Sequence, residues 1–165
     1  MIDFQDRVAV VTGAGRGLGA AHATLLASRG AAVIVNDPGV ATDGTEGEHR
    51  PADEVVAAIT GAGGAAVADY GSVSDPEAAA AMVQRAVDEF GRIDIVVNNA
   101  GILRDKAFHN LESADLEAVL DVHLKGAFFV TQPAFRLMRE QGYGRIVVTS
   151  SASGLLGNFG QSNYG

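Results

Sequence analysis

A glycine-rich turn runs from Thr12 to Gly19, with the sequence TGAGRGLG, directly after an apolar segment rich in valine. Glycines at such a turn let the chain bend sharply and let a diphosphate approach the backbone. The amides and the dipole of the helix that follows then stabilise the negative charge. An ordinary loop can also be rich in glycine, but the place between a strand and a helix favours a dinucleotide site. The candidate cofactor-binding residues here are Gly13, Arg16, Gly17, Leu18 and Gly19.

An acid, Asp37, follows the second predicted strand. In a dinucleotide-binding domain this position accepts hydrogen bonds from the adenosine ribose, and its charge would repel a 2′-phosphate. Asp37 therefore favours NAD over NADP as the cofactor. Arg16 argues mildly the other way, because a guanidinium could neutralise a 2′-phosphate. The alternative interpretation of Asp37 is an acid that opens a turn before Pro38.

Short apolar segments alternate along the chain with segments of helical periodicity. Strands are predicted over residues 7–12, 31–36, 65–70, 93–97 and 145–150, and helices over residues 18–29, 53–59, 76–90 and 113–140. The helix at 76–90 has the clearest signals, because Asp75 suits the N-cap, Pro76 the first turn and Gly91 the stop. Pro133 is expected to kink the last helix.

This alternation predicts a doubly wound parallel sheet of the α/β class, the Rossmann fold, because each right-handed crossover helix returns the chain to the sheet. We expect residues 1–165 to form a single NAD(P)-binding domain. The polar stretch Pro38–Pro51 is long enough to be a functional or mobile insertion in that domain. Its acids Asp43, Glu46 and Glu48 are expected to be solvated.

Composition excludes several classes of function. Of 165 residues, 47% are apolar and 19% charged, which is enough to bury a core. With 12 basic and 20 acidic residues the formal net charge is −8, which argues against a nucleic-acid partner. There is no cysteine, in agreement with a reducing compartment. The acidic amino terminus and the lack of a membrane-length apolar segment predict a cytoplasmic protein with no membrane partner.

Three motifs in register resemble those of the short-chain dehydrogenases/reductases. The turn Thr12–Gly19 is similar to their TGxxxGxG motif, and Asn98-Asn99-Ala100-Gly101 is similar to the NNAG motif after their fourth strand. Ser151 stands thirteen positions before Tyr164, which is the interval between the substrate-orienting serine and the catalytic tyrosine in that family.

One subgroup of this family resembles the chain further, in the segments that begin at Val96, Gly144 and Gly157 and in the Pro38–Pro51 insertion. These are similar to the (3R)-hydroxyacyl-CoA dehydrogenase domain of peroxisomal multifunctional β-oxidation enzymes and their bacterial relatives. The resemblance therefore implies an NAD-dependent oxidoreductase that transfers hydride between nicotinamide and a secondary alcohol or ketone. The substrate that it favours is a 3-hydroxyacyl-CoA. The substrate partner would be an acyl-CoA.

The resemblance also implies roles for individual residues. Tyr164 would exchange a proton with the substrate oxygen, and Ser151 would hold that oxygen. A phenol has an ordinary pKa of about 10, so proton transfer near neutrality requires a cation beside it. The further implied cofactor-binding residues are Asn99, Ala100 and Gly101 near the turn, and Ser72 and Val73 beside the adenine, with Ser72 in the place of the family's acid.

The family's cation is a lysine four positions after the tyrosine, and this sequence ends at Gly165. We therefore expect the amino-terminal portion of a longer enzyme, without the last elements of the family fold and with residues 145–150 as an exposed sheet edge. The resemblance implies a homodimer or homotetramer, built partly through the helix from Ser113.

His123 stands where most members of the family carry an asparagine, and the hydroxyacyl-CoA subgroup resembles this chain in having histidine there. It shares a helical stripe with Val119, Leu120, Leu124 and Ala127, which predicts that it points inward. A buried histidine satisfied by the backbone and a residue that supports the site are equally compatible with this pattern.

Other chemistries find little support. His22, His49 and His109 are scattered without carboxylates at ligand spacing, so no metal site is predicted. Ser150 and Ser153 beside Ser151 lack a nucleophile elbow, which disfavours a hydrolase. The alternatives that stay open are an NADPH-dependent ketoacyl reductase and a dinucleotide-binding module without turnover.

Overall fold

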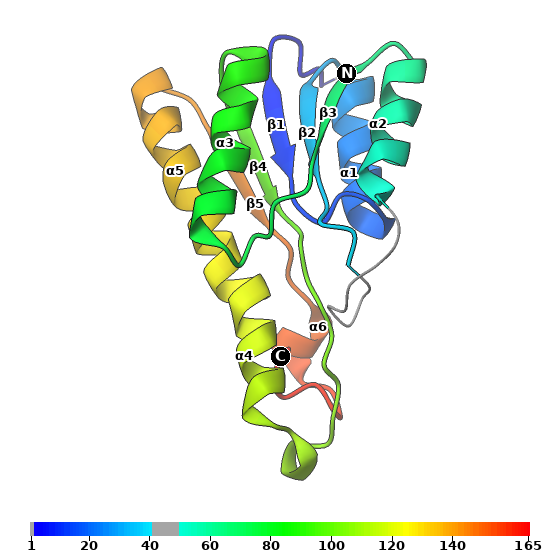
Figure 1. Ribbon diagram of the computed structural model, residues 1–165, viewed down its shortest axis with the longest axis vertical. Coiled ribbons are helices and arrows are strands. Elements are labelled where there is room, and N and C mark those ends of the chain that lie inside the picture. Colours follow the sequence, from blue (N-terminus) through cyan, green and yellow to red (C-terminus); the bar gives the residue numbers. More distant parts are fainter. Residues whose placement is uncertain (1, 41–49) are drawn as a thin grey trace.

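The computed structural model describes residues 2–40 and 50–165, so Asp43, Glu46, Glu48, His49 and most of the Pro38–Pro51 insertion lie outside the described residues. Five parallel strands form one sheet in the order β3-β2-β1-β4-β5. They are β1 (Val8–Val11), β2 (Ala32–Asn36), β3 (Ala65–Asp69), β4 (Ile95–Asn98) and β5 (Arg145–Val148). Helices α1 (Gly17–Ser28) and α2 (Pro51–Gly61) cover one face, and α3 (Pro76–Phe90) and α5 (Gly126–Gln141) cover the other (Figure 1). The predicted doubly wound parallel sheet is confirmed.

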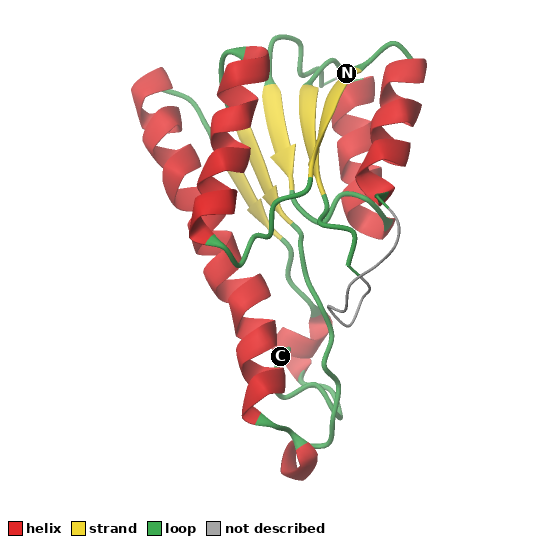
Figure 2. Ribbon diagram, in the orientation of Figure 1, coloured by secondary structure: helices red, strands yellow, loops and turns green. Residues whose placement is uncertain are grey.

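The core lies on both faces of the central strands. Every residue of β1 and β4 is buried, and Val10 is paired in register with Ile34 of β2 and Val96 of β4. These strands are almost continuously apolar because helices cover both of their faces, as Figure 2 shows for the yellow strands between the red helical layers. The rigid sheet fixes the positions of the loops at its carboxyl edge.

The helix ends follow from local chemistry. The Asp75 carboxylate accepts hydrogen bonds from the amides of Glu77 at 2.9 Å and Ala78 at 3.3 Å, so it caps α3 as predicted. Gly91 ends α3 with a φ of +80°, in the left-handed region. Helix α2 begins at Pro51, before the predicted start, because proline suits the first helical position.

The long helix predicted over residues 113–140 consists of three parts. They are α4 (Ser113–Leu120), the π-helical turn η2 (Asp121–Lys125) and α5. The π turn changes the phase of the helix, so the predicted stripe is wrong in part: Val119 is 1% exposed, whereas Leu124 is 54% exposed. Helix α5 continues through Pro133, although the proline has no amide hydrogen to donate, and the π-helical hydrogen bonding lies earlier in the chain, at η2.

Two short helices were absent from the prediction, η1 (Phe108–Asn110) and α6 (Ala152–Leu156). Strand β5 lies at the edge of the sheet and all of its residues are exposed, as predicted. In residues 2–40 and 50–165, no helix is both long enough and apolar enough to cross a bilayer.

Candidate active site

Two adjoining cavities open at the carboxyl edge of the sheet, where the chain leaves β1 toward β2 on one side and β4 lies on the other. Such a switch point is the usual ligand site of an open α/β sheet. We call one the turn cavity, of about 480 Å³, lined among others by Gly13, Arg16, Asp37 and Ser72. The other, of about 280 Å³, is the tyrosine cavity, lined among others by Leu18, His123 and Tyr164. Both share the lining residues Val73, Asn99, Ala100, Gly101, Ile102 and Val122.

The glycine turn is too close to its neighbours to carry side chains. A Cβ at Gly13 would lie 2.8 Å from the Cα of Ala100, and a Cβ at Gly19 would lie 2.2 Å from the carbonyl oxygen of Gly13. Gly13 and Gly17 also have φ values of +59° and +53°. Arg16, the N-cap of α1, makes no side-chain capping bond, and the first turn of α1 has no acid. The helix start therefore suits an anion.

Asp37 lines the turn cavity and also holds the glycine turn. Its carboxylate accepts hydrogen bonds from the amide of Gly15 at 3.0 Å and from the amide of Gly39 at 2.8 Å. The bond to Gly39 is the turn-opening interaction that the alternative interpretation predicted. The structure thus shows the turn-opening interaction, and Asp37 also lines the turn cavity, while its contact with a ribose stays a prediction.

Thr12 connects the glycine turn to the Asn98–Gly101 segment. Its Oγ1 accepts hydrogen bonds from the amides of Asn99 and Ala100, both at 3.0 Å, and donates to the carbonyl of Val97 at 3.3 Å. The side-chain amide of Asn99 donates in turn to the carbonyls of Thr12 at 3.0 Å and Gly13 at 3.1 Å. The two motifs therefore form one rigid unit between the cavities.

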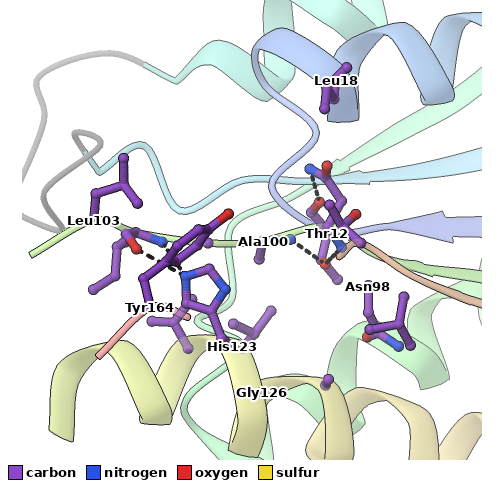
Figure 3. A pocket seen from close by; sticks show the side chains of 16 residues that line it. Thr12, Leu18, Asn98, Ala100, Leu103, His123, Gly126 and Tyr164 are labelled. Atoms are coloured by element: carbon purple, nitrogen blue, oxygen red, sulfur yellow. Dashed lines mark hydrogen bonds between the residues drawn. The ribbon is translucent and has the colours of Figure 1, made fainter. Parts of the chain in front are cut away.

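Tyr164 and His123 lie against each other in the tyrosine cavity (Figure 3). Their ring centroids are 5.2 Å apart and the rings are inclined at 80°, an edge-to-face contact. His123 Nε2 lies 3.0 Å from the amide nitrogen and 2.9 Å from the carbonyl oxygen of Ile102. Gly101 permits this approach, since a Cβ there would lie 2.4 Å from His123 Cε1. His123 is both satisfied by the backbone and in contact with the candidate catalytic residue.

Most of the predicted site residues meet in these cavities. The turn cavity brings together Gly13, Arg16, Asp37, Ser72, Val73, Asn99, Ala100 and Gly101, and the tyrosine cavity adds Leu18 and Tyr164. Gly17 and Gly19 shape the turn without lining either cavity. Ser151 lies outside both linings, and its hydroxyl caps α6 by accepting a hydrogen bond from the amide of Ser153 at 3.2 Å.

The two lysines of the chain are both paired with carboxylates. Lys106 lies 2.7 Å from Asp115 and Lys125 lies 2.6 Å from Asp121, and in each case the hydrogen bond to the carboxylate raises the pKa of the amine. Tyr164 is half-buried and lines the tyrosine cavity, and within the described residues its hydroxyl makes no hydrogen bond. In that same part of the chain, no three His, Asp or Glu side chains are grouped to hold a metal ion.

The turn cavity fits a dinucleotide by its own chemistry. A Cβ at Gly17 would meet no atom within 4 Å, so the first residue of α1 leaves open space, and the uncapped helix start provides amide donors. Among the buried atoms that have no hydrogen-bond partner in the described residues are Asn36 Oδ1 and Arg104 Nε, both in residues that line this cavity. Such atoms favour a polar ligand. Thr12, Ile102 and Arg104 were not among the predicted site residues, and only Thr12 had a signal in the sequence, as the first residue of the glycine turn.

The profile of the short chain dehydrogenase family matches residues 7–165. The peroxisomal multifunctional enzyme type 2 of Drosophila melanogaster is 55% identical over 161 residues, which are 98% of this chain and 26% of that protein. The hydroxyacyl-CoA dehydrogenase ChsB1 of Mycobacterium tuberculosis is 43% identical over 170 residues, 98% of this chain and 52% of that protein. A crystal structure of a short chain dehydrogenase from Mycobacterium avium matches with a TM-score of 0.88 at 46% identity, covering 98% of this chain and 57% of that one.

The fold and the glycine turn define a Rossmann-type dinucleotide-binding protein. More narrowly, the chain belongs to the short-chain dehydrogenase family, whose members are oxidoreductases that bind a nicotinamide dinucleotide. The predictions of family and fold class are confirmed. The chain spans between about a quarter and three fifths of the length of these relatives.

Proposed function

We propose that residues 1–165 form one domain that binds NAD and carries the proton-transferring tyrosine of an oxidoreductase acting on a 3-hydroxyacyl-CoA. The observation that supports this most is the joining of the two cavities through Asn99, Ala100 and Gly101, with the glycine turn in one lining and Tyr164 in the other. A dinucleotide bound across both cavities supplies a hydride acceptor or donor. The name of the mycobacterial hydroxyacyl-CoA dehydrogenase supports the substrate class.

Each group of residues has a separate task in this proposal. The turn and the start of α1 hold the diphosphate, Asp37 accepts from the ribose, and Ser72 and Val73 lie beside the adenine. Tyr164 gives a proton to the substrate oxygen or takes it, depending on the direction. Its ordinary pKa of about 10 must fall by about three units for this work near neutrality, which requires roughly 4 kcal/mol of differential stabilisation. Neither lysine is free to supply it, since both are paired with carboxylates.

Substitution of Tyr164 tests the proposed reaction. We expect Tyr164→Phe to abolish NAD reduction by a (3R)-hydroxyacyl-CoA, followed by absorbance at 340 nm, while the Kd for NAD stays within twofold. Tyr143→Phe is the matched control, because Tyr143 lies beside Arg7 and Arg145, away from both linings. Turnover retained in Tyr164→Phe would exclude the proton role. If NAD does not bind to the folded protein, the whole proposal fails.

Asp37 supports NAD as the cofactor over NADP. Its carboxylate lines the turn cavity and is fixed by two backbone amides, so a 2′-phosphate placed there would meet a negative charge. Calorimetry should show tighter binding of NAD than of NADP, and Asp37→Asn should reduce the ratio between the two Kd values. An NADPH-dependent ketoacyl reductase is the second candidate, favoured by Arg16 in the same lining. Equal or better binding of NADPH to the unsubstituted protein would select it.

A dinucleotide-binding module without turnover is the non-enzymatic candidate. It is favoured by the position of Ser151, whose hydroxyl caps α6 and does not line the tyrosine cavity. NAD binding with no turnover on any hydroxyacyl-CoA would select it. Ser151→Ala separates the cases, because it lowers kcat if Ser151 holds the substrate oxygen and changes only stability if it acts as a cap.

For the assembly, we propose a homodimer or homotetramer built through α4 and α5. Large apolar side chains are exposed along α4, η2 and α5, at Leu116, Leu120, Leu124, Phe128 and Phe135, with 67% exposure at Phe128. Light scattering should show an oligomer that Phe128→Glu weakens, and a monomer at micromolar concentration would contradict this. We also propose a cytoplasmic location, supported by the absence of cysteine, and cell fractionation tests it.

A further inference from the structure

Tyr164 is preceded by a buried amide side chain. Asn163 is 7% exposed, and both ends of its side-chain amide are bonded. Its Nδ2 donates a hydrogen bond to the carbonyl of Arg104 at 2.9 Å, and its Oδ1 accepts one from the amide of Tyr164 at 3.0 Å. A single side chain thus joins the backbone of Tyr164 to a loop 59 residues earlier in the chain.

Two other hydrogen bonds join the same two segments, residues 104–106 and 160–163, which we call the clasp. The amide of Lys106 donates to the carbonyl of Gly160 at 2.9 Å, and Gln161 Nε2 donates to Asp105 Oδ2 at 2.7 Å. The bond between Gln161 and Asp105 is exposed, whereas the amide of Asn163 is buried. Water competes less for the part-buried hydrogen bonds of Asn163 than for the exposed bond of Gln161, so Asn163 makes the more consequential of these two side-chain contacts.

The clasp stands beside both cavities. Arg104 lines the turn cavity, and its neighbours Ile102 and Leu103 line the tyrosine cavity. His123 holds this same loop at Ile102 and touches the ring of Tyr164, while Asn163 holds it at Arg104 and bonds to the backbone of Tyr164 (Figure 3 shows Leu103, His123 and Tyr164). His123 therefore contacts the ring of Tyr164, and Asn163 holds its backbone.

We propose that Asn163 is a positioning residue for Tyr164: its buried amide ties Tyr164 to the loop after β4 and so fixes the phenol in the tyrosine cavity. This role rests on the proposed proton transfer by Tyr164. Asn163 touches neither reacting atom nor dinucleotide, since it lines neither cavity. Its loss therefore affects the chemical step and not the binding of the dinucleotide.

Near-ultraviolet circular dichroism isolates Tyr164, because the chain has three tyrosines and no tryptophan. The difference between the unsubstituted protein and Tyr164→Phe gives the contribution of Tyr164. Asn163→Ala removes the amide. Asn163→Asp keeps its size and its acceptor oxygen but, once ionised, cannot donate to the carbonyl of Arg104. We expect both variants to lose at least half of the Tyr164 contribution and to lower kcat at least tenfold, with the Kd for NAD within twofold.

Asn110→Ala is the matched control, because Asn110 lies in η1 and is exposed; it should retain the signal and kcat. If Asn163→Ala fails to fold, the isosteric Asn163→Asp decides. The proposal is overturned if the variants keep the Tyr164 signal or keep kcat, or if kcat and NAD affinity fall together. Retained turnover in Tyr164→Phe would instead refute the proton role of Tyr164, and the positioning role would fall with it.

Discussion

Replacing Thr12 by valine removes one hydroxyl and keeps the shape of the side chain. Thr12 is 1% exposed, and its Oγ1 accepts hydrogen bonds from the amides of Asn99 and Ala100. In Thr12→Val both amides lose their partner. An amide left without a partner in a buried place costs about 1–3 kcal/mol. The two amides are only partly buried, so we take values near the lower end and expect a total loss of about 2–3 kcal/mol in the free energy of unfolding.

Urea unfolding followed by far-ultraviolet circular dichroism measures this loss. With a slope of about 1–3 kcal/mol per molar urea for a small protein, the midpoint should fall by about 0.7–3 M. Thr12→Ser is the matched control, because it keeps the hydroxyl and removes one methyl group, at a cost of about 1 kcal/mol. The Kd for NAD should also rise in Thr12→Val, since the hydroxyl connects the glycine turn to Asn99.

The comparison between the two variants decides the matter. If Thr12→Val is no less stable than Thr12→Ser, the hydroxyl does not hold the two segments together, and the described role of Thr12 is wrong. If the slope of the unfolding curve changes, the loss cannot be assigned to these two hydrogen bonds.

Three other predictions follow from contacts described above or from the buried Asp94. Gly19→Ala should abolish NAD binding in calorimetry, because its Cβ would lie 2.2 Å from the carbonyl oxygen of Gly13; Gly61→Ala, with no atom within 4 Å, should bind normally. Gly101→Ala should displace the His123 ring, whose Cε1 would lie 2.4 Å from the new Cβ, and should change the near-ultraviolet signal of Tyr164; an unchanged signal would contradict the packing. Burial alone would raise the pKa of Asp94, but hydrogen bonds from Arg92, the amide of Val8 and Arg7 outweigh it, so its pKa is lower than usual. The ionised Asp94 therefore stabilises the fold above its unfolded pKa of about 3.9, and this stabilisation is lost as pH falls through the lower folded pKa. In urea unfolding between pH 5 and pH 2, Asp94→Asn should lose less free energy of unfolding on acidification than the unsubstituted protein. An equal loss in the two proteins would refute this.

The sequence predicted the sheet well, because the patterns that indicate strands and helix ends arise from interactions within a few residues. Valine-rich strands are apolar throughout when both faces are covered, and Asp75 with Pro76 determines the start of α3 through bonds within its first turn. Gly13 and Gly17 have positive φ values, so the local backbone conformation explains why glycine stands at these positions of the turn. Contacts between residues near in sequence leave such a signature.

Contacts between distant residues left no such signature. The hydrogen bond from Asn163 to Arg104 spans 59 positions, and that from Ala100 to Thr12 spans 88, so no spacing rule indicates either. The π turn at Asp121–Lys125 breaks a periodicity that a uniform helix would have kept, which is why Leu124 was wrongly placed on the inward stripe. Ser151 was chosen by resemblance, and the cap that it forms on α6 is visible only once the fold is known.

Because of the π turn at Asp121–Lys125, the number of residues in this stretch matters more than the types of their side chains. After it, Gly126, Val130, Ala134 and Met138 fall on one buried line of α5. A π turn holds one residue more than the α-helical turn it replaces, so deleting one residue between Asp121 and Lys125 would leave a continuous α-helix and keep that line facing the sheet. Inserting one residue would instead rotate the line by about 100° against α4, the angle of one helical residue. Apolar side chains would then turn toward water and Phe128 or Phe135 toward the sheet. Scanning of insertions and deletions should therefore find that this stretch accepts the loss of one residue but not the gain of one, while substitutions at its exposed positions, such as Leu124, are accepted.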